Sequence, residues 1–138
     1  ATMRAEQAVI GGEGNGGVIY PALHAGRDAL VGIAMVLQML SDQDATLAEV
    51  MAGYPPVAMV KDKIGQEGPF RADAVRDALA GLGEGTLDDR DGVRWAGTSG
   101  WVHVRPSNTE PIVRVIAEAP TEDEARDLVE RTRARLQG

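Results

Sequence analysis

The segment WVHVRPSNTEPIVRVIA, residues 101–117, contains two apolar runs on either side of a short polar stretch. Trp101–Val104 alternates in polarity and Ile112–Ala117 is rich in β-branched residues, so both runs are predicted to be strands. The stretch between them, Arg105–Pro111, reads RPSNTEP and holds an arginine, two hydroxyls and an amide within five residues. Such a connection offers several hydrogen-bond donors to one bound anion.

Composition alone leaves two interpretations of this connection open. The guanidinium of Arg105 is a planar fork that suits phosphate oxygens, and a second arginine, Arg114, follows closely. The hydroxyls and N–H groups of residues 107–109 can form a concave nest around an oxyanion. The same residue types also form ordinary turns without any ligand.

The overall composition limits the classes of function. The chain has 138 residues, a net charge of −7 and no cysteine. The lack of cysteine excludes disulfides and thiol catalysis and suits a reducing compartment, so we expect a cytoplasmic protein. An acidic chain repels nucleic acid and anionic lipid, and the longest apolar stretch, Ala29–Leu40, is too short to span a bilayer. We therefore expect neither partner.

The first half of the chain is organised around a glycine-rich stretch. Residues 11–17 read GGEGNGG, between the apolar runs Ala8–Ile10 and Val18–Tyr20, which predicts a strand, a loop and a second strand. Glu13 accepts hydrogen bonds and Asn15 both donates and accepts them, so the pair suits sugar hydroxyls. The alternative is a flexible loop without a ligand.

The helix predicted over Asp28–Leu40 is apolar on all sides, a pattern typical of a helix buried on both faces. Nothing else in the first half is large enough to cover it, so we expect it to belong to a larger layered domain or to be covered by another subunit. A short helix follows, capped by Thr46 and Glu49. The Pro55-Pro56 pair is then a stiff boundary, which divides the chain into residues 1–54 and 55–138.

The second half alternates strand and helix patterns. Its predicted order is β-α-β-β-β-β-α, with a hairpin turn at Asp91-Gly92 and a capping box at Thr121 and Glu124. This order predicts an α+β domain in which two helices pack on one face of an antiparallel sheet. The predicted elements are Val57–Ile64, Arg71–Leu82, Thr86–Asp89, Val93–Ala96, Trp101–Arg105, Ile112–Glu118 and a final helix with the buried stripe Ala125, Leu128, Val129, Thr132 and Leu136.

Two separated motifs resemble one family. Arg105–Pro111 resembles the phosphate-binding loop in the last domain of the α-D-phosphohexomutases, which include phosphoglucomutases, phosphomannomutases and phosphoglucosamine mutases. Gly12–Gly16, GEGNG, resembles the sugar-binding loop of their third domain, and Asp91–Arg94, DGVR, also looks like the family. The resemblance covers nearly the whole chain, and the order and separation of the motifs fit two successive domains.

The resemblance implies a fold and two sets of binding residues. Residues 1–54 would form the end of the third domain, an incomplete α/β domain, and residues 55–138 the fourth domain, with a TATA-binding-protein-like α+β fold. Glu13 and Asn15 would bind sugar hydroxyls. The residues implied for binding the phosphate that is not transferred are Arg105, Ser107, Asn108 and Thr109, with Arg114 as an addition.

The resemblance also implies an activity. The family interconverts hexose 1-phosphates and 6-phosphates through a sugar bisphosphate intermediate, using a phosphoserine in the first domain and Mg²⁺ on an aspartate-rich loop of the second. This chain contains neither loop. We therefore expect it to supply no catalytic residue and no metal ligand, to be inactive alone, and to act with the N-terminal domains of the same enzyme as a C-terminal fragment.

The chain also departs from the family pattern. Many members have serine where this chain has Asn15, and histidine where it has Gly17, and that histidine is a candidate acid or base in those members. The GGEGNGG form resembles the archaeal-type branch. His24 is either a replacement for the missing histidine or a structural residue.

Two other functions remain open on the sequence alone. The chain could be a free-standing module that binds phosphorylated sugars or regulates another protein without catalysis. It could also be a folded scaffold whose apolar helix drives formation of a homodimer. The hexose itself is not specified, because few contacts read its hydroxyls.

Overall fold

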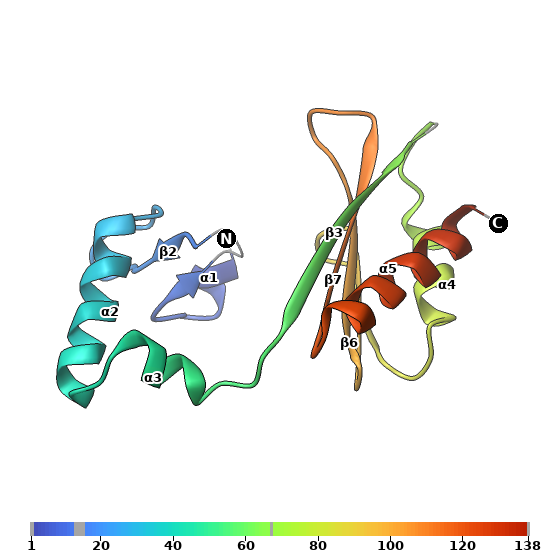
Figure 1. The fold of residues 1–138 in the computed structure, drawn as a ribbon. Helices are drawn as coiled ribbons and strands as arrows, with labels where there is room; N and C mark the ends of the chain where they lie inside the picture. Colours follow the sequence, from blue (N-terminus) through green and yellow to red (C-terminus); the bar gives the residue numbers. More distant parts are fainter. Residues whose placement is uncertain (1, 13–15, 67, 138) are drawn as a thin grey trace. The chain divides into compact units, whose positions relative to one another are not determined.

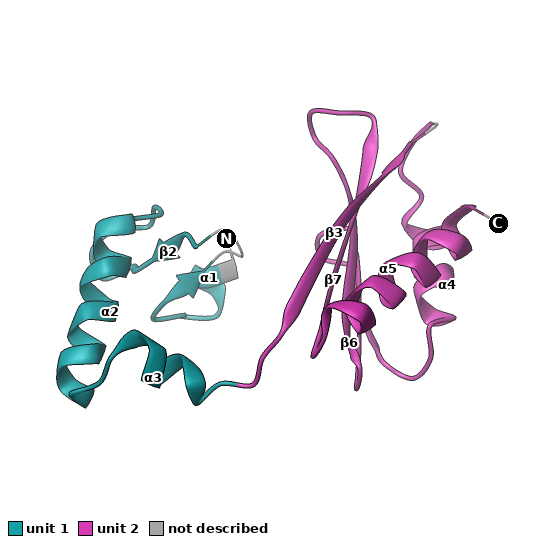
Figure 2. Ribbon diagram, in the orientation of Figure 1, with its two compact units in different colours: residues 1–54 teal, residues 55–138 magenta. Residues whose placement is uncertain are grey.

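The computed structural model describes residues 2–12, 16–66 and 68–137. The chain divides into two compact units, Ala1–Tyr54 and Pro55–Gly138, which Figure 2 shows in different colours. The division falls between Tyr54 and Pro55, where the ring of proline fixes φ and removes a backbone donor.

In the first unit, the described residues form two short strands and three helices. They are α1 (Thr2–Ala5), β1 (Gly11–Gly12), β2 (Val18–Ile19), α2 (Ala29–Gln43) and α3 (Leu47–Ala52). The strand predicted over Ala8–Ile10 is wrong, because the chain is still turning out of α1 there: Gln7 has φ of 50° and the N–H of Ala8 donates to the carbonyl of Met3. The strand forms one step later, where Gly11–Gly12 pairs antiparallel with Val18–Ile19.

Helix α2 begins and ends at aspartates. The Asp28 carboxylate accepts hydrogen bonds from the N–H groups of Leu30 at 2.8 Å and Val31 at 3.1 Å, which satisfies two of the free donors at the helix start. Asp44 ends the helix in the left-handed conformation, later than the predicted end at Leu40. In the described part of the chain, no helix is long and apolar enough to cross a membrane.

Helix α2 is not covered within this chain, as expected from the lack of any other element in the first half that is large enough to cover it. No residue of α2 is buried, and Leu30 is 78% exposed. The unit is too small to bury a helix that is apolar on every side, because only short strands and short helices accompany it. The predicted capping box at the start of α3 is confirmed, with Thr46 and Glu49 bonded to each other's backbone N–H groups.

The second unit is an antiparallel sheet covered on one face by two helices. Its five strands lie in the order β3-β7-β6-β5-β4, and every neighbouring pair is antiparallel. Helix α5 packs against β3, β7 and β6 (Figure 1), while α4 packs against β5, β4 and α5. The predicted α+β class is confirmed. The elements are β3 (Ala58–Gly65), α4 (Ala72–Ala80), β4 (Thr86–Asp88), β5 (Val93–Gly97), β6 (Gly100–Pro106), β7 (Ile112–Ala119) and α5 (Glu122–Gln137).

The core lies between the sheet and its two helices. Side chains alternate between the faces of each strand, so every second residue of β5, β6 and β7 points at the helices. The helices contribute apolar residues at helical spacing, and Leu79 of α4 is fully buried. Most of the core is aliphatic, with Trp95 as its one large aromatic among the buried residues. The buried core cluster is Val75, Leu79, Leu82, Val93, Trp95, Val102, Val104, Val115, Ala117, Ala119, Ala125, Leu128 and Val129.

Helix α4 was expected to continue to Leu82, but it ends at Ala80, where Gly81 is the C-cap. Two arginines tie α5 to the rest of the unit: Arg131 donates to the carbonyl of Leu82 at 2.7 Å, and Arg133 pairs with Asp62 of β3 at 3.3 Å.

Replacement of Leu79 tests the core. We expect Leu79→Ala to lower the free energy of unfolding by about 2–5 kcal/mol, because it removes a fully buried side chain and leaves a cavity. Urea denaturation followed by circular dichroism measures this change. The control is Val57→Ala, which truncates a side chain that is 61% exposed. Equal effects of the two substitutions would contradict this placement of the core.

Candidate functional site

The RPSNTEP connection joins β6 to β7 and closes on itself through its own backbone. The N–H of Ser107 donates to the carbonyl of Ile112 at 2.9 Å, and the N–H of Ile112 donates to the carbonyl of Glu110 at 2.8 Å. The hydroxyls of Ser107 and Thr109 lie 3.4 Å apart, and the N–H of Thr109 points at the Ser107 hydroxyl. The two hydroxyls are therefore brought to one side of a tight loop.

Arg105 lies at the start of this loop, and its guanidinium is only partly hydrogen-bonded. Its Nη1 lies 3.4 Å from a carboxylate oxygen of Asp91, a long contact for an ion pair. Its Nε is buried and has no hydrogen-bond partner within the described residues. A buried donor without a partner costs about 1–3 kcal/mol, so this nitrogen is a local cost in the structure.

Arg114 lies directly across from Arg105. The two residues are register partners in the β6–β7 pair, so their side chains leave the same face of the sheet. That face is the one opposite the helices, because the neighbouring Val104 and Val115 are fully buried in the core. Of the predicted phosphate-binding residues, the structure thus brings Arg105, Arg114 and the two loop hydroxyls to one edge of the unit. Asn108 is exposed at the tip of the same loop.

The turn between β4 and β5 packs closely against Arg105, at the start of the β6–β7 loop. Gly92 has φ of 66°, and a Cβ added there would lie 2.8 Å from the Cβ and 2.9 Å from the Cα of Arg105. The carbonyl of Asp91 accepts a hydrogen bond from the His103 ring. Next to this turn, Arg90 lowers the pKa of the Asp88 carboxyl to about 2. The pairing of Asp91 with Arg105 was not predicted, although both flank the paired strands β5 and β6.

The other predicted site is not described by the structure. Glu13 and Asn15, the candidates for sugar hydroxyls, lie outside the described residues. The glycine-rich stretch is described at its two ends, where β1 and β2 pair, and Gly16 has φ of 85°. No group of three or more metal-ligating side chains occurs among the residues described here.

Both ring nitrogens of His24 are engaged in local hydrogen bonds at the start of α2. Its Nδ1 accepts a hydrogen bond from the N–H of Gly26 at 3.0 Å, and its Nε2 lies 3.0 Å from the Asp28 carboxylate. An acceptor at Nδ1 and a carboxylate at Nε2 assign the proton to Nε2. Both ring nitrogens are thus engaged in holding the residue that caps α2. The hydrogen bond from His24 is the main cause that lowers the pKa of the Asp28 carboxyl below its ordinary value.

Comparisons with known proteins agree on one family. The model of the phosphoglucomutase/phosphomannomutase C-terminal domain matches residues 56–135, and that of alpha/beta/alpha domain III matches residues 1–57. A probable phosphoglucosamine mutase of Methanopyrus kandleri is 35% identical over 130 residues, which cover 93% of this chain and 29% of that protein. A phosphoglucomutase/phosphomannomutase of Thermococcus kodakarensis is 35% identical over 122 residues, or 88% of this chain and 27% of that protein.

Solved structures show the same fold. A phosphoglucomutase/phosphomannomutase family protein of Burkholderia thailandensis superposes with a TM-score of 0.73 at 23% identity. The match covers 99% of this chain and 29% of that protein. The N-acetylphosphoglucosamine mutase of Aspergillus fumigatus in complex with glucose 1,6-bisphosphate superposes with a TM-score of 0.55 at 25% identity. The match covers 82% of this chain and 21% of that protein.

These matches follow the order of the two units and run through both. The chain belongs to the phosphoglucomutase/phosphomannomutase family, as its two motifs had indicated. It spans less than a third of the length of the relatives named above.

Replacement of Gly92 tests the support of the loop. Gly92→Ala is expected to lower the free energy of unfolding by about 1–3 kcal/mol, because alanine disfavours the positive φ and its Cβ would press on Arg105. The same substitution should shift the amide resonances of residues 104–107. Thermal unfolding and ¹⁵N spectra measure both effects. Gly65→Ala, at a site with open space for a Cβ, is the matched control. A Gly92→Ala protein as stable as the control would refute this packing.

Removal of His24 tests the capping arrangement. With His24→Ala, the pKa of the Asp28 carboxyl should rise toward its ordinary value of 3.8, because the main hydrogen bond to the carboxylate is lost. A carboxyl with a lowered folded-state pKa adds stability above pH 3.8 and loses it as the pH falls through the folded-state pKa, so the variant should lose that contribution. Carbon-detected NMR titration measures the pKa, with His103→Ala as control. An unchanged Asp28 pKa would argue against the contact.

Proposed function

We propose that this chain is the substrate-holding C-terminal part of a phosphohexomutase, which interconverts hexose 1-phosphate and 6-phosphate. The observation that carries the proposal is the pair Arg105 and Arg114 on adjacent strands, next to a loop with two converging hydroxyls. Guanidinium groups and hydroxyls of this kind suit a phosphate, since each arginine supplies a planar fork of donors. The class of enzyme is that of the relatives, several of which are phosphoglucosamine mutases.

In this proposal the loop holds the phosphate that does not react. Arg105, Ser107, Asn108 and Thr109 bind its oxygens, and Arg114 adds a second guanidinium from β7. Fixing a distal group of the substrate places the reacting end, and the orientation so gained lowers the barrier without any bond forming at this site. Glu13 and Asn15 would bind sugar hydroxyls from the other unit.

The chemical step is assigned to other parts of the enzyme. The N-terminal domains would contribute the phosphoserine and the Mg²⁺ site, and a sugar bisphosphate would be the intermediate that turns over between the two half-reactions. The Aspergillus relative, solved with glucose 1,6-bisphosphate, makes such an intermediate chemically reasonable for the family. This chain alone would bind a phosphorylated hexose and lack activity. We place the whole enzyme in the cytoplasm.

A homodimer is a further partner to test. Helix α2 exposes apolar residues on several sides, among them Leu30, Ile33 and Leu37. In the full-length enzyme, the rest of the first unit's domain would cover this surface. Sedimentation of the 138-residue chain distinguishes the two cases, because a second copy on α2 would make the chain dimeric.

Binding of a hexose phosphate to the 138-residue chain tests the proposal directly. Titration calorimetry with glucose 1-phosphate and glucosamine 6-phosphate should show binding by the original chain and none by Arg105→Ala. Arg105→Lys should weaken binding by about tenfold, even though it keeps the charge, because lysine is a point charge and cannot form the bidentate fork.

The matched control is Arg126→Ala, which removes an exposed arginine paired with Glu122 on α5. It should bind like the original chain. If Arg105→Lys binds as tightly as this control, the bidentate role is wrong. If the original chain binds no hexose phosphate at all, the holding role is wrong.

A further inference from the structure

The face of the second unit opposite its helices gathers positive charge. Strand alternation places Lys61 and Lys63 of β3 on this face, since the residues between and beside them, such as Asp62, point toward α5. Arg114 of β7, Arg105 of β6 and Arg94 of β5 leave the sheet on the same side. This concentration of cations occurs in a chain whose net charge is −7.

Three of these cations form one row across three strands. The register pairs Lys63 with Arg114, and Arg114 with Arg105. Directly opposed residues in an antiparallel pair have Cβ atoms about 4.5–5.5 Å apart, and like charges at this spacing are destabilising. The row is therefore a local electrostatic cost that a bound anion would relieve.

The row also lacks counter-ions from the protein. Within the described residues, the side chains of Lys61, Lys63 and Arg114 make no hydrogen bond or ion pair, and that of Arg105 has only the long contact to Asp91. Three arginines of α5 behave differently, because each has a carboxylate within 4 Å. These pairs are Arg126 with Glu122, Arg131 with Asp127 and Arg133 with Asp62. Among the described residues, the row of Lys63, Arg114 and Arg105 thus lacks the close carboxylate partners that these three arginines of α5 have.

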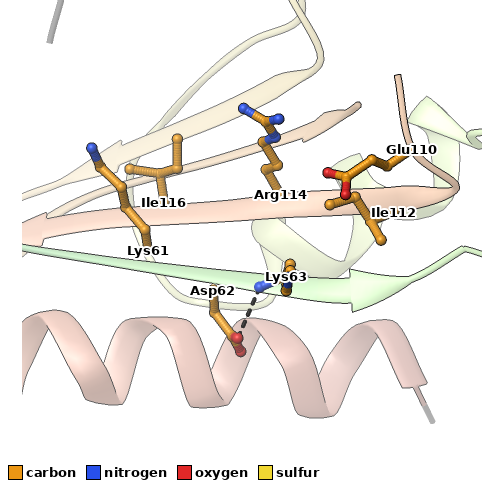
Figure 3. A pocket seen from close by; sticks show the side chains of 7 residues that line it. All are labelled: Lys61, Asp62, Lys63, Glu110, Ile112, Arg114 and Ile116. Atoms are coloured by element: carbon orange, nitrogen blue, oxygen red, sulfur yellow. Dashed lines mark hydrogen bonds between the residues drawn. The ribbon is translucent and has the colours of Figure 1, made fainter. Parts of the chain in front are cut away.

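A pocket of about 460 Å³ lies over this face, in the size range of small-molecule sites. Figure 3 shows Lys61, Ile116 and Arg114 rising from their strands on the side away from α5, whereas Asp62 points toward the helix. Ile112 and Ile116 give the pocket an apolar surface between the charges. The carboxylate of Glu110 stands at one end, where it accepts hydrogen bonds and so suits hydroxyls rather than phosphate.

We infer that Lys63, assisted by Lys61, is a further ligand-binding residue of the proposed phosphate site. The row of Lys63, Arg114 and Arg105 is then one anion-binding surface, which takes a phosphorylated sugar with its phosphate toward the cations and its hydroxyls toward Glu110. This inference rests on the proposed function, because it extends the same site from the β6–β7 loop to β3. It adds residues more than forty positions upstream of the loop.

The test is a ¹⁵N NMR titration of the 138-residue chain with glucose 1-phosphate and, separately, with inorganic phosphate at low salt. Lys63→Ala should raise the Kd for both probes by about tenfold and Lys61→Ala by about threefold, because each removes one cation from the site. Both lysines are exposed, so the fold should survive, and the spectra verify this. Arg126→Ala removes the same charge from the helical face and should leave both Kd values unchanged. Higher ionic strength should weaken binding less in Lys63→Ala than in the original chain.

The outcomes separate this inference from the proposed function. If Arg105→Ala loses binding while Lys63→Ala matches Arg126→Ala, the loop binds phosphate without β3, and the inference is wrong. If Lys63→Ala loses binding while Arg105→Ala retains it, β3 is the anion site and the proposed loop is wrong. A chain that binds neither probe overturns both. If Arg105→Ala, Lys63→Ala and Arg126→Ala all weaken binding equally, binding responds only to the net charge of the chain, and the inference is wrong.

Discussion

The pairing of β6 with β7 is the constraint on which the second unit depends. These neighbouring strands are aligned so that Val104 opposes Val115 and Arg105 opposes Arg114. Because side chains alternate between faces, this one register sends the valines into the core under α5 and the arginines to the open face. A shift of one residue would exchange the two sets. Burial of the valines thus specifies the register, and the register in turn specifies the position of the arginines.

The two faces of the sheet use charge in opposite ways. On the helical side, Arg131 donates to the carbonyl of Leu82 and Arg133 pairs with Asp62 of β3, so these two arginines of α5 stabilise the packing of the helix. On the open face, Lys63, Arg114 and Arg105 are paired poorly or not at all within the described residues, and one guanidinium nitrogen of Arg105 is buried without a partner. Unsatisfied donors and opposed like charges cost stability, and such costs are found mainly where a ligand offsets them.

Much of the second unit was predictable from local patterns. The alternation in residues 101–117, the turn at Asp91-Gly92 and the helical spacing of Ala125, Leu128 and Val129 each depend on near neighbours in the sequence. The first unit was predicted less well. The strand expected at Ala8–Ile10 forms at Gly11–Gly12 instead, because a short apolar run does not specify what it pairs with. The hydrophobicity of a helix indicates that its surface is normally buried, but it does not tell which part of the protein buries it.

The sequence by itself determined the α+β class of the second unit, the family, and the loop residues that suit a phosphate, because these follow from periodicity and from motifs of contiguous residues. Only the tertiary structure decided which distant residues share that surface. Lys63 lies far from Arg114 in the chain and Asp91 far from Arg105, and nothing in their local sequence links them. The reason is physical: strand register and sheet order are set by burial of the core, and the cations on the opposite face take the positions that this burial imposes.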